Sequence, residues 1–302
     1  MQAVQFDDYG DPDVLHVAEV EEPHAGAGQI RVAVRAAGVN PFDWKVRSGA
    51  LQQVMPVQFP YIPGVEVAGV IDEVGDGVTG VSAGDEVFGN TSRGTAQYAV
   101  LQGFAAKPAA MSWAEAAALP TAAETSARAL GLLGVKSGQT VLINGAAGGV
   151  GTVATQFAIA AGASVIGTAS EASHDYLRSL GATPITYGPG LVSRVREIAP
   201  NGVDLALDIA GRGALPDLVE ITGGPDNVIT IADYSAAQYD VRFTGGGPDE
   251  RRPDALSTAA TLYEQGKLSV LIAQTFPLEQ AAEAHRISHD GHVRGKLVIT
   301  VE

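Results

Sequence analysis

One segment, residues 140–170 (TVLINGAAGGVGTVATQFAIAAGASVIGTAS), constrains the fold of this chain more than any other. The apolar run at residues 141–143 predicts a strand buried on both faces of a parallel sheet, and a glycine-rich turn follows at residues 145–151. Apolar residues then recur at helical spacing, at Val150, Ala154, Phe157 and Ala161. Gly162 is suited to a left-handed helix end, and a second strand follows at once. This order of strand, turn, helix and strand predicts a binding site for a dinucleotide.

The glycines of the turn fit the chemistry of a pyrophosphate. Backbone N–H groups at a helix start, helped by the helix dipole, hold such an anion only where no side chain intervenes. The candidate contacts are Ala147, Gly148, Gly149 and Val150. Gly148 permits the close approach, Gly151 lets helix and strand pack closely, and Ala146 stands where the usual first glycine would be. A tight α/β turn without a ligand is the structural alternative; we prefer the dinucleotide site because both strands and the helix have the required spacing.

Length and composition indicate a globular protein of two domains. The chain has 302 residues, of which 46% are hydrophobic and 18% charged, so each domain can bury its own core. No apolar run has the length needed to cross a bilayer and no signal segment is visible, so we expect a cytoplasmic protein without membrane insertion. The net charge of -15 disfavours nucleic acid as a partner. The absence of cysteine excludes disulfides and every cysteine-based metal site.

The chain changes character after its first third. Short β-type runs separated by Gly, Pro and Asp come first, at residues 29–36, 65–74, 86–88 and 96–100, and predict a rolled, mostly antiparallel unit. Residues 113–133 are alanine-rich and helical in pattern. From residue 140 onward strands and helices alternate, as in an α/β domain.

The alternating part contains the number of strands that a full dinucleotide fold requires. Six strands are expected at residues 141–143, 165–168, 184–187, 205–209, 228–231 and 241–244, with helices around Tyr176, Val195 and Leu218. A helix over 255–266, a β-run at 269–273, a helix over 278–287 and a last run at 296–301 complete the chain. We therefore expect a doubly wound parallel Rossmann sheet at residues 119–265, and a second, mostly antiparallel domain formed by residues 1–118 with 266–302.

Seven segments, taken in order, resemble one known family. They are AAGVNPFDWKVRSG (36–49), PGVEVAGVIDEVG (63–75), GDEVFG (84–89), LPTAAETSARAL (119–130), GAAGGVG (145–151), LGAT (180–183) and GKLVI (295–299). Together they resemble the medium-chain dehydrogenase/reductase superfamily, in the zinc-independent branch typified by quinone oxidoreductases. The resemblance implies a GroES-like catalytic domain beside an NADP-binding Rossmann domain, and metal-free reduction of a quinone or other α,β-unsaturated carbonyl compound.

The residues that bind zinc in metal-dependent relatives are replaced here. Those relatives carry a Gly-His-Glu motif, whereas this chain has Gly64, Val65 and Glu66, and valine cannot ligate a metal. Cysteine ligands are excluded as well, so we expect no zinc. For Glu66 we expect a partly buried carboxylate paired with a basic group such as Arg47.

The end of the second Rossmann strand indicates the choice of cofactor. A domain that selects NAD usually presents Asp or Glu there to the adenosine ribose, whereas this strand ends at Ser170. A small neutral residue leaves room for a 2′-phosphate, so we expect NADPH in preference to NADH. Glu171 follows, and we assign it to a helix start, where the helix dipole stabilises its negative charge. The resemblance implies that Tyr187 flanks the 2′-phosphate and that Arg294 or Lys296 supplies positive charge.

The resemblance also implies a place for the reacting end of the cofactor. Ala210 and Ile231 would line the nicotinamide side, and Thr121 would lie close to its ring. A conjugated carbonyl compound activates itself, so a hydrogen bond to its oxygen can stabilise the developing charge without a metal. Asn40 is the first candidate for this polar contact with the small-molecule substrate and Tyr61 the second.

Two other functions stay open from the sequence. An enoyl-thioester reductase would need a basic entrance for its carrier, and no basic cluster is evident. A cofactor-binding but catalytically idle protein, structural or regulatory, would bind NADPH without turnover. We expect a homodimer, because the last Rossmann strand at residues 240–244 would otherwise leave an exposed edge. The histidines His285, His289 and His292 are expected on a solvent-facing helix rather than at a metal.

Overall fold

The computed structural model describes residues 1–291 and 293–301, and the chain forms two compact units. Unit 1 comprises Met1–Thr121, Leu256–Gln265 and Val270–Glu302, and unit 2 comprises Ala122–Ala255 and Gly266–Ser269. The boundaries that we expect from the sequence differ chiefly at residues 256–265, which pack with unit 1. The reason is local packing, since the Tyr263 hydroxyl donates to Glu115 Oε1 (3.3 Å) within that unit.

Unit 2 is built on a six-stranded sheet in which every pair of neighbours is parallel. Its strands are β8 (Thr140–Asn144), β9 (Ser164–Ala169), β10 (Thr183–Thr186), β11 (Leu205–Asp208), β12 (Val228–Thr230) and β13 (Arg242–Phe243). They lie in the order β10-β9-β8-β11-β12-β13, which is the 3-2-1-4-5-6 order of a Rossmann sheet. The expected doubly wound fold and all six of its strands are confirmed.

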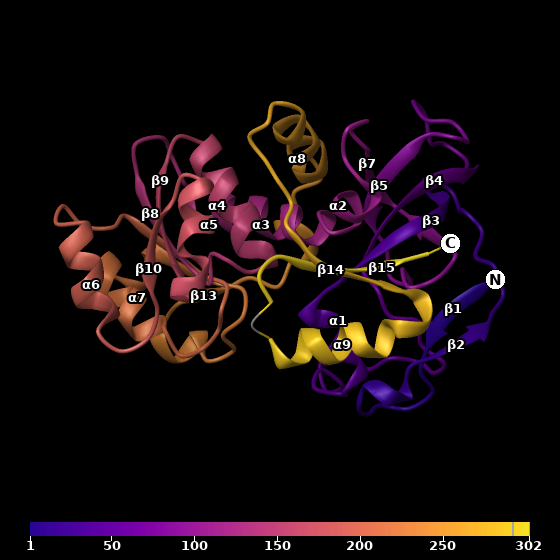
Figure 1. Cartoon of the computed structure of the whole chain (residues 1–302), viewed down its shortest axis with the longest axis horizontal. Helices are drawn as coiled ribbons and strands as arrows, with labels where there is room; N and C mark the ends of the chain where they lie inside the picture. Colours follow the sequence, from indigo (N-terminus) through magenta and orange to yellow (C-terminus); the bar gives the residue numbers. More distant parts are fainter. Residues whose placement is uncertain (292, 302) are drawn as a thin grey trace. The chain divides into compact units, whose positions relative to one another are not determined.

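Helices cover both faces of this sheet. They are α4 (Gly149–Ala160), α5 (His174–Ser179), α6 (Leu191–Ile198) and α7 (Leu215–Thr222), and α3 (Pro120–Leu133), which begins at the unit boundary, contacts α4. Figure 1 shows α4 and α5 on one side of the strands and α6 and α7 on the other. Leu191 and Val195 bury one face of α6, and Leu218 does the same in α7, against sheet residues such as Leu142. Each such burial contributes about 1.5–3 kcal/mol relative to an exposed side chain.

Unit 1 is built on a mostly antiparallel seven-stranded sheet, as expected. Its strands are β3 (Ile30–Val39), β4 (Glu66–Val74), β5 (Glu86–Asn90), β6 (Tyr98–Leu101), β7 (Gly103–Ala106), β14 (Ile272–Pro277) and β15 (Lys296–Thr300). The order is β14-β15-β3-β4-β5-β7 with β6 on β3, and among these pairs β14 and β15 run parallel. A two-stranded antiparallel sheet joins β1 (Gln2–Gln5) to β2 (His16–Glu19). The chain's end therefore returns to the first domain.

The β-run that we expected at residues 269–273 begins later than the sequence pattern suggests. The strand there is β14, at Ile272–Pro277. Ser269 instead belongs to unit 2, because its N–H and hydroxyl both donate to Gln156 Oε1, at 2.8 and 3.2 Å. A strand that began at Ser269 would have to give up these bonds to α4.

The helices of unit 1 are α1 (Pro41–Arg47), α2 (Trp113–Ala117), α8 (Ala255–Glu264) and α9 (Ala281–Asp290). The alanine-rich stretch 113–133 forms two helices, α2 and α3, because Pro120 has no N–H to continue the first of them. Short 3-10 helices are η1 (Pro12–Val14), η2 (Glu171–Ser173), η3 (Pro225–Asn227), η4 (Ala236–Tyr239), η5 (Pro248–Glu250) and η6 (Leu278–Gln280). In the described part of the chain, no helix combines the length and apolar character that crossing a bilayer requires.

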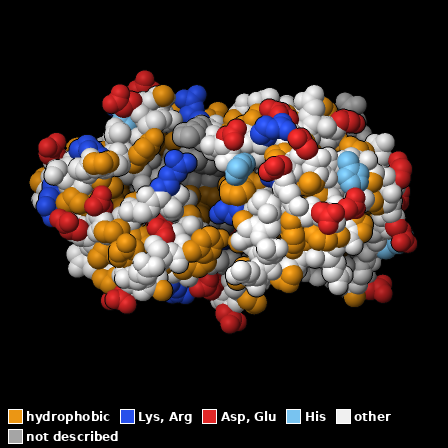
Figure 2. Space-filling model, turned by 90° about the horizontal axis from the view of Figure 1, so that it is seen from below, with side chains coloured by type: hydrophobic (Ala, Val, Ile, Leu, Met, Phe, Trp, Pro, Cys, Tyr) orange, Lys and Arg blue, Asp and Glu red, His pale blue; other side chains and the backbone are white. Residues whose placement is uncertain are grey.

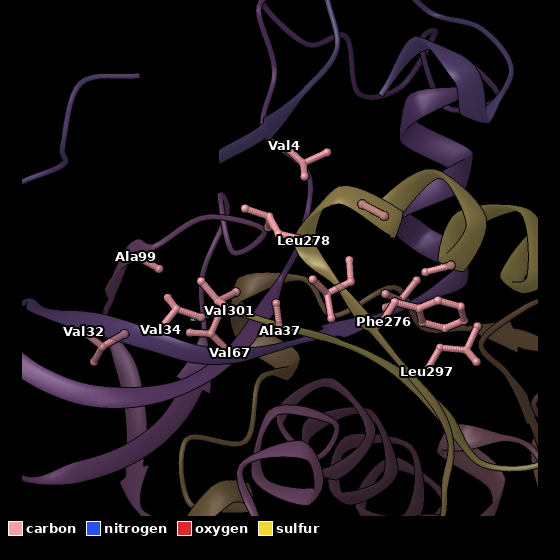
Figure 3. Close-up of a cluster of buried hydrophobic side chains, with 14 of the residues drawn as sticks. Val4, Val32, Val34, Ala37, Val67, Ala99, Phe276, Leu278, Leu297 and Val301 are labelled. Atoms are coloured by element: carbon pink, nitrogen blue, oxygen red, sulfur yellow. The ribbon is translucent and has the colours of Figure 1, made fainter. Parts of the chain in front are cut away.

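The main core of unit 1 lies where β3, β4, β14 and β15 meet α9. Its buried apolar residues include Val32, Val34, Ala37, Val67, Phe276, Leu297 and Val301, several of which are labelled in Figure 3. Residues 30–34 of β3 alternate between buried and half-buried, which is the pattern of a strand with one face on the core. This core holds β3, β4 and β15, the three strands whose ends carry the polar cluster described below.

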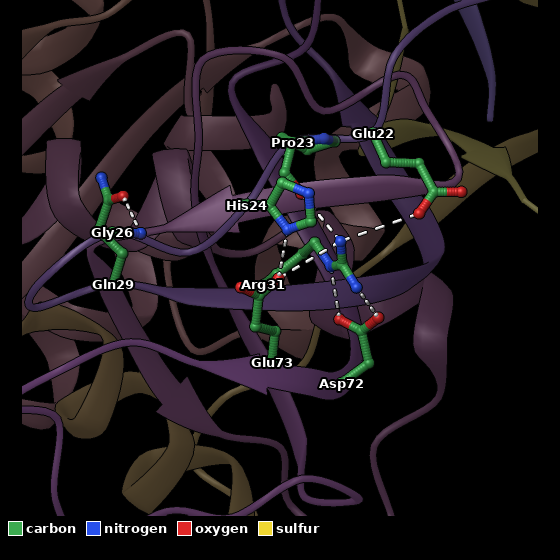
Figure 4. Close-up of polar contacts among 8 residues, drawn as sticks. All are labelled: Glu22, Pro23, His24, Gly26, Gln29, Arg31, Asp72 and Glu73. Atoms are coloured by element: carbon green, nitrogen blue, oxygen red, sulfur yellow. Dashed lines mark hydrogen bonds and ion pairs between the residues drawn. The ribbon is translucent and has the colours of Figure 1, made fainter.

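An ion-pair cluster ties the segment before β3 to the sheet (Figure 4). Arg31 on β3 donates from Nε (3.1 Å) and Nη2 (2.8 Å) to the two carboxylate oxygens of Asp72 on β4, and from Nη1 to Pro23 O (3.0 Å). Glu73 adds a second carboxylate at 3.3 Å and also bonds His24. The bidentate bond to Asp72 is the main cause of the raised pKa of Arg31.

Candidate functional site

The glycine turn after β8 is packed tightly on one side and open on the other. A Cβ added at Gly151 would lie 2.1 Å from Gly145 O, so only glycine fits there, as the sequence predicts. Gly145 itself has φ +89°, a conformation that favours glycine. At Gly148, by contrast, the nearest atom to an added Cβ is Gly145 O at 3.5 Å, an ordinary contact. The protein's own packing therefore does not require glycine at 148, whereas the approach of a ligand would.

The start of α4 presents backbone donors at this open side. Gly148 is the N-cap, and it offers no side chain to cap the helix. The first N–H groups of any α-helix lack an intrahelical acceptor, which here applies to Gly149, Val150 and Gly151. Such donors together with the helix dipole suit a phosphate group. The turn thus fits the pyrophosphate of a dinucleotide.

The cofactor residues expected in unit 2 lie after five neighbouring strands. Ala147, Gly148, Gly149 and Val150 follow β8, Ser170 follows β9, Tyr187 follows β10, Ala210 follows β11 and Ile231 follows β12. Because all these strands are parallel, the positions share the carboxyl edge of the sheet, where ligands of such folds bind. Ser170 and Ala210 are exposed and Tyr187 is 50% exposed, so these side chains are accessible within unit 2. Glu171 begins η2, as expected.

A buried hydrogen-bond chain that sequence reasoning missed joins these strand ends. The Thr168 hydroxyl donates to Asn144 Oδ1 (2.6 Å), and Asn144 Nδ2 donates to Asp208 Oδ1 (2.9 Å). The Thr230 hydroxyl donates to Asp208 Oδ2 (2.8 Å). All four residues are buried, and each is the last or second-last residue of its strand. The sequence signal that could have predicted these bonds is a polar residue at the end of an apolar strand run.

Two of these four residues, Thr168 and Asp208, orient loops that would contact the cofactor. Thr168 Oγ1 accepts a hydrogen bond from the N–H of Gly145 (3.0 Å), which starts the glycine turn. Asp208 Oδ1 accepts from the N–H groups of Ala210 (3.2 Å) and Gly211 (3.1 Å). Ile231 N–H donates to Asp208 O at 3.0 Å. These hydrogen bonds therefore fix the backbone of three of the expected binding loops, those after β8, β11 and β12.

In unit 1, Asn40, Thr121 and Lys296 converge on one buried carboxylate, that of Glu66. The Lys296 ammonium donates to Glu66 Oε1 (2.7 Å) and to Asn40 Oδ1 (2.6 Å). Asn40 Nδ2 donates to Glu66 Oε1 (2.8 Å), and the Thr121 N–H donates to Glu66 Oε2 (2.7 Å). Glu66 is 0% exposed and Lys296 6%. Glu66, Lys296 and Asn40 are thus buried, whereas Thr121 is half-buried.

This cluster corrects three expectations. Glu66 pairs with Lys296 and not with Arg47, whose guanidinium instead donates to Gly10 O. Lys296 is committed to that buried pair, so we no longer assign it to the cofactor phosphate. Asn40 is 4% exposed and both of its polar side-chain atoms already have partners, which makes it a residue that orders the cluster. Glu66 and Lys296 are 230 positions apart, so no local pattern could pair them.

Asp43 is a second buried carboxyl group next to this cluster. It is the third residue of α1, and its Oδ2 accepts a hydrogen bond from the Asn40 N–H at 2.8 Å. Burial is the main cause that raises the pKa of Asp43 to about 7, and the charge of Glu66 adds to the effect. The group is thus partly protonated near neutral pH.

Of the residues expected to contact the substrate, Tyr61 and Thr121 each have a hydroxyl group without a hydrogen-bond partner among the described residues. Tyr61 is half-buried with its ring against Phe6, and no hydrogen bond of its hydroxyl is found among the described residues. Burial raises the pKa of Tyr61, so the phenol stays protonated at neutral pH. The Thr121 hydroxyl oxygen is buried and has no partner within residues 1–291 and 293–301. Either group can donate a hydrogen bond to a carbonyl oxygen.

The histidines near the C-terminus are arranged differently from our expectation. His285 is buried on α9, so a solvent-facing position is wrong for it; His289 is exposed, with its ring 4.6 Å from that of Trp44. His292 lies outside the described residues. Burial is the main cause that lowers the pKa of His285 to about 3. Among the residues that the structure describes, no three His, Asp or Glu side chains are grouped to hold a metal.

Comparison with known proteins agrees with this architecture. A family model described as alcohol dehydrogenase GroES-like domain matches residues 26–127, and one described as zinc-binding dehydrogenase matches residues 180–299. The chain is 30% identical to a chloroplast envelope quinone oxidoreductase homolog of Arabidopsis thaliana, over 99% of this chain and 98% of that protein.

Solved structures agree as well. The structure of Escherichia coli quinone oxidoreductase complexed with NADPH is 26% identical, with a TM-score of 0.85, and covers 100% of both chains. CurK enoyl reductase is 25% identical, with a TM-score of 0.88, over 100% of this chain and 99% of that one. With Val65 in place of a metal-binding histidine, the chain belongs to the zinc-independent quinone oxidoreductase branch of the medium-chain dehydrogenase/reductase superfamily and is an oxidoreductase.

Proposed function

We propose that the chain is an NADPH-dependent reductase of quinones or other α,β-unsaturated carbonyl compounds. The observation that carries the proposal is the carboxyl edge of the unit 2 sheet. There an uncapped helix start at Gly148 lies one strand away from the end of β9, which is followed by Ser170 and not by a carboxylate. The first feature suits a pyrophosphate, and the second removes the repulsion that an acid would exert on a 2′-phosphate. The NADPH complex of the Escherichia coli relative supports the same cofactor.

The residues that we assign to the cofactor are those of the unit 2 edge. They are Ala147, Gly148, Gly149, Val150, Ser170, Tyr187, Ala210 and Ile231. When bound, NADPH supplies a hydride from its nicotinamide ring. The chain's own contribution is to hold the dinucleotide, to keep water away and to fix the acceptor in place.

For the acceptor we assign hydrogen-bond donors in unit 1. Tyr61 and Thr121 are the proposed contacts to the carbonyl oxygen, because each has a hydroxyl without a partner among the described residues. Such donors stabilise the negative charge that develops on that oxygen during reduction. Asn40 is proposed to act indirectly, by holding the Glu66 and Lys296 cluster in place. Glu66 in turn holds the N–H of Thr121.

An acceptor panel tests this proposal. Purified protein is titrated calorimetrically with NADPH and NADH, and NADPH oxidation is then followed with a quinone, an α,β-unsaturated ketone and a saturated ketone as control. We expect NADPH to bind more tightly than NADH, and oxidation with the conjugated acceptors alone. Binding of neither nucleotide would refute the whole proposal, whereas binding without oxidation of any acceptor would refute the proposed substrates.

An enoyl-thioester reductase is the second candidate, favoured by the similarity to CurK enoyl reductase. Thioester carriers bear phosphates and are held by basic surfaces. On the face shown in Figure 2, Lys and Arg side chains are scattered among Asp and Glu and form no continuous patch. We therefore rank this activity second, and an enoyl thioester in the panel tests it directly.

The membership in an oxidoreductase family leads us to set aside the alternative of a protein that binds the cofactor without catalysing a reaction.

We also propose that the protein is a homodimer that pairs along β13. This short strand is the last of its sheet, and its Phe243 (38% exposed) forms an aromatic pair with Tyr234 (67% exposed), with ring centroids 5.3 Å apart. An edge strand with exposed aromatic residues gains stability when a second copy covers it. Sedimentation at micromolar concentration should give a dimer, and a monomer would refute it. A cytoplasmic location stays a prediction.

A further inference from the structure

The loop after β10 is folded around the guanidinium group of Arg194. Nε donates to Thr186 O at 3.1 Å, and Nη2 donates to the carbonyls of Thr186 (2.9 Å), Tyr187 (3.2 Å) and Gly188 (3.0 Å). Nη1 donates to Pro189 O at 2.7 Å. Four consecutive carbonyl groups therefore turn toward one cation on α6. A guanidinium bound in this way fixes the conformation of the loop and leaves a positive charge directly behind it.

The orientation of the carbonyls determines what the loop presents on its other side. In a trans peptide the N–H points away from the C=O of the same unit, and these peptides are trans. With the carbonyls of Thr186 and Tyr187 turned toward Arg194, the N–H groups of Tyr187 and Gly188 point away from it. Successive N–H groups of this kind form a concave site that attracts anions.

The strand register puts this loop beside Ser170. Thr186 on β10 is paired with Ala169 on β9, and the two strands are parallel. Tyr187 and Ser170 are therefore the next residues on adjacent strands, which lie about 4.8 Å apart. The end of β9 is where a Rossmann domain meets the adenosine ribose. Both residues are exposed within unit 2.

Other cations are less suited to this position. Arg178 is 58% exposed on α5, where it forms a surface pair with Asp175 at 2.6 Å. Lys296 is buried in unit 1 with Glu66. Arg194 combines a half-buried guanidinium with a contact to the residue next to Ser170 in space.

We propose that Arg194 is the positioning residue that makes this edge selective for the 2′-phosphate of NADPH. It orders residues 187–190 so that Tyr187 and the loop N–H groups meet the phosphate beside Ser170. The inference rests on the proposed use of NADPH and adds the residue that produces the preference over NADH. Because Arg194 acts through the loop, its removal should affect ligands with a 2′-phosphate and spare those without one.

Fragments of the cofactor separate this role from catalysis. The full chain is titrated calorimetrically with adenosine 2′,5′-bisphosphate and with adenosine 5′-monophosphate, which differ in the 2′-phosphate. We expect the wild-type chain to prefer the bisphosphate. Arg194→Gln should weaken bisphosphate binding about tenfold or more, the scale of one or two charge-assisted hydrogen bonds, and change monophosphate binding by less than about twofold. Arg196→Gln is the matched control on α6, since Arg196 is exposed and pairs with Glu220.

Two further readouts keep the inference falsifiable if Arg194→Gln folds poorly. In Arg194→Lys the charge remains, but a lysine cannot hold four carbonyls, so we expect the preference to fall there as well. Amide hydrogen exchange of Leu191, whose N–H donates to Gly188 O at 3.1 Å and so closes this loop, should accelerate in both variants and not in Arg196→Gln. An unchanged preference in either Arg194 variant would overturn the inference while leaving the NADPH proposal intact. A wild-type chain without preference for the bisphosphate would overturn the proposed cofactor and this inference together.

Discussion

Asn144 Nδ2 donates a 2.9 Å hydrogen bond to Asp208 Oδ1, which joins the ends of β8 and β11, the two central strands of the Rossmann sheet. The contact is linked to the glycine turn through Thr168. Its hydroxyl donates a hydrogen bond to Asn144 Oδ1 and accepts one from the Gly145 N–H. The backbone conformation at the carboxyl edge of the sheet therefore depends on a buried layer of polar side chains as well as on the glycines. A buried network of this kind is stabilising only while every member is satisfied.

The first prediction concerns Asp208, which accepts hydrogen bonds from Asn144, Thr230 and the N–H groups of Ala210 and Gly211. Asp208→Leu would leave these donors buried without an acceptor, so we expect the free energy of unfolding to fall by about 3 kcal/mol or more. Urea unfolding measures the change. Asp204→Ala is the control at the other end of the same strand pair, where an exposed carboxylate accepts one N–H bond, and it should cost about 1 kcal/mol. Equal costs at the two positions would contradict the buried network.

Local patterns in the sequence were sufficient to predict the unit 2 sheet. A turn such as Gly145–Gly151 and apolar runs of strand length depend on neighbours within a few residues, and the structure confirms them. The polar layer was not predicted, because Asn144 and Asp208 become neighbours only once the strand order is known. In unit 1 the partner of Glu66 was not predicted for the same reason, because Lys296 is 230 positions away in the sequence.

The second prediction concerns that partner. Glu66→Gln would leave the Lys296 ammonium buried without its counter-charge, so we expect a loss of about 3–5 kcal/mol in the free energy of unfolding. The double variant Glu66→Gln with Lys296→Met removes both charges, and we expect it to recover most of that loss. Chemical denaturation of the two variants gives the comparison. Glu220→Gln, in an exposed pair with Arg196, should cost less than about 1 kcal/mol. If the double variant is no more stable than Glu66→Gln, the unpaired charge of Lys296 is not the cause of the lost stability.

The third prediction distinguishes two glycines of one turn. Gly151→Ala would place a Cβ 2.1 Å from Gly145 O, so we expect overpacking that lowers stability by about 1–3 kcal/mol. Gly148→Ala meets no close protein atom and should leave the melting temperature nearly unchanged. Its added methyl group would instead obstruct the pyrophosphate, so NADPH affinity should fall about tenfold. Thermal unfolding and calorimetry measure both effects, and NADPH binding that is unaffected by Gly148→Ala would remove the turn from the cofactor site.

The fourth prediction concerns acid and the buried His285. Its pKa is lowered from 6.5 to about 3 in the folded chain, first by burial and then by the charge of Arg47. Between these two pH values the unfolded state binds a proton that the folded state does not. The contribution to stability is therefore complete above pH 6.5 and is lost as the pH falls toward 3, by about 1.4 kcal/mol per pH unit.

A histidine variant isolates this effect from the carboxylates, which titrate in the same range. His285→Gln cannot bind the proton, so from pH 6.5 to 5 its free energy of unfolding should fall by roughly 2 kcal/mol less than that of the wild-type chain. Urea unfolding at several pH values gives the two slopes. His289→Gln is the matched control one turn away on α9, and because His289 is exposed it should leave the slope unchanged. Parallel curves for the wild-type chain and His285→Gln would mean that the pKa of His285 is not lowered in the folded chain.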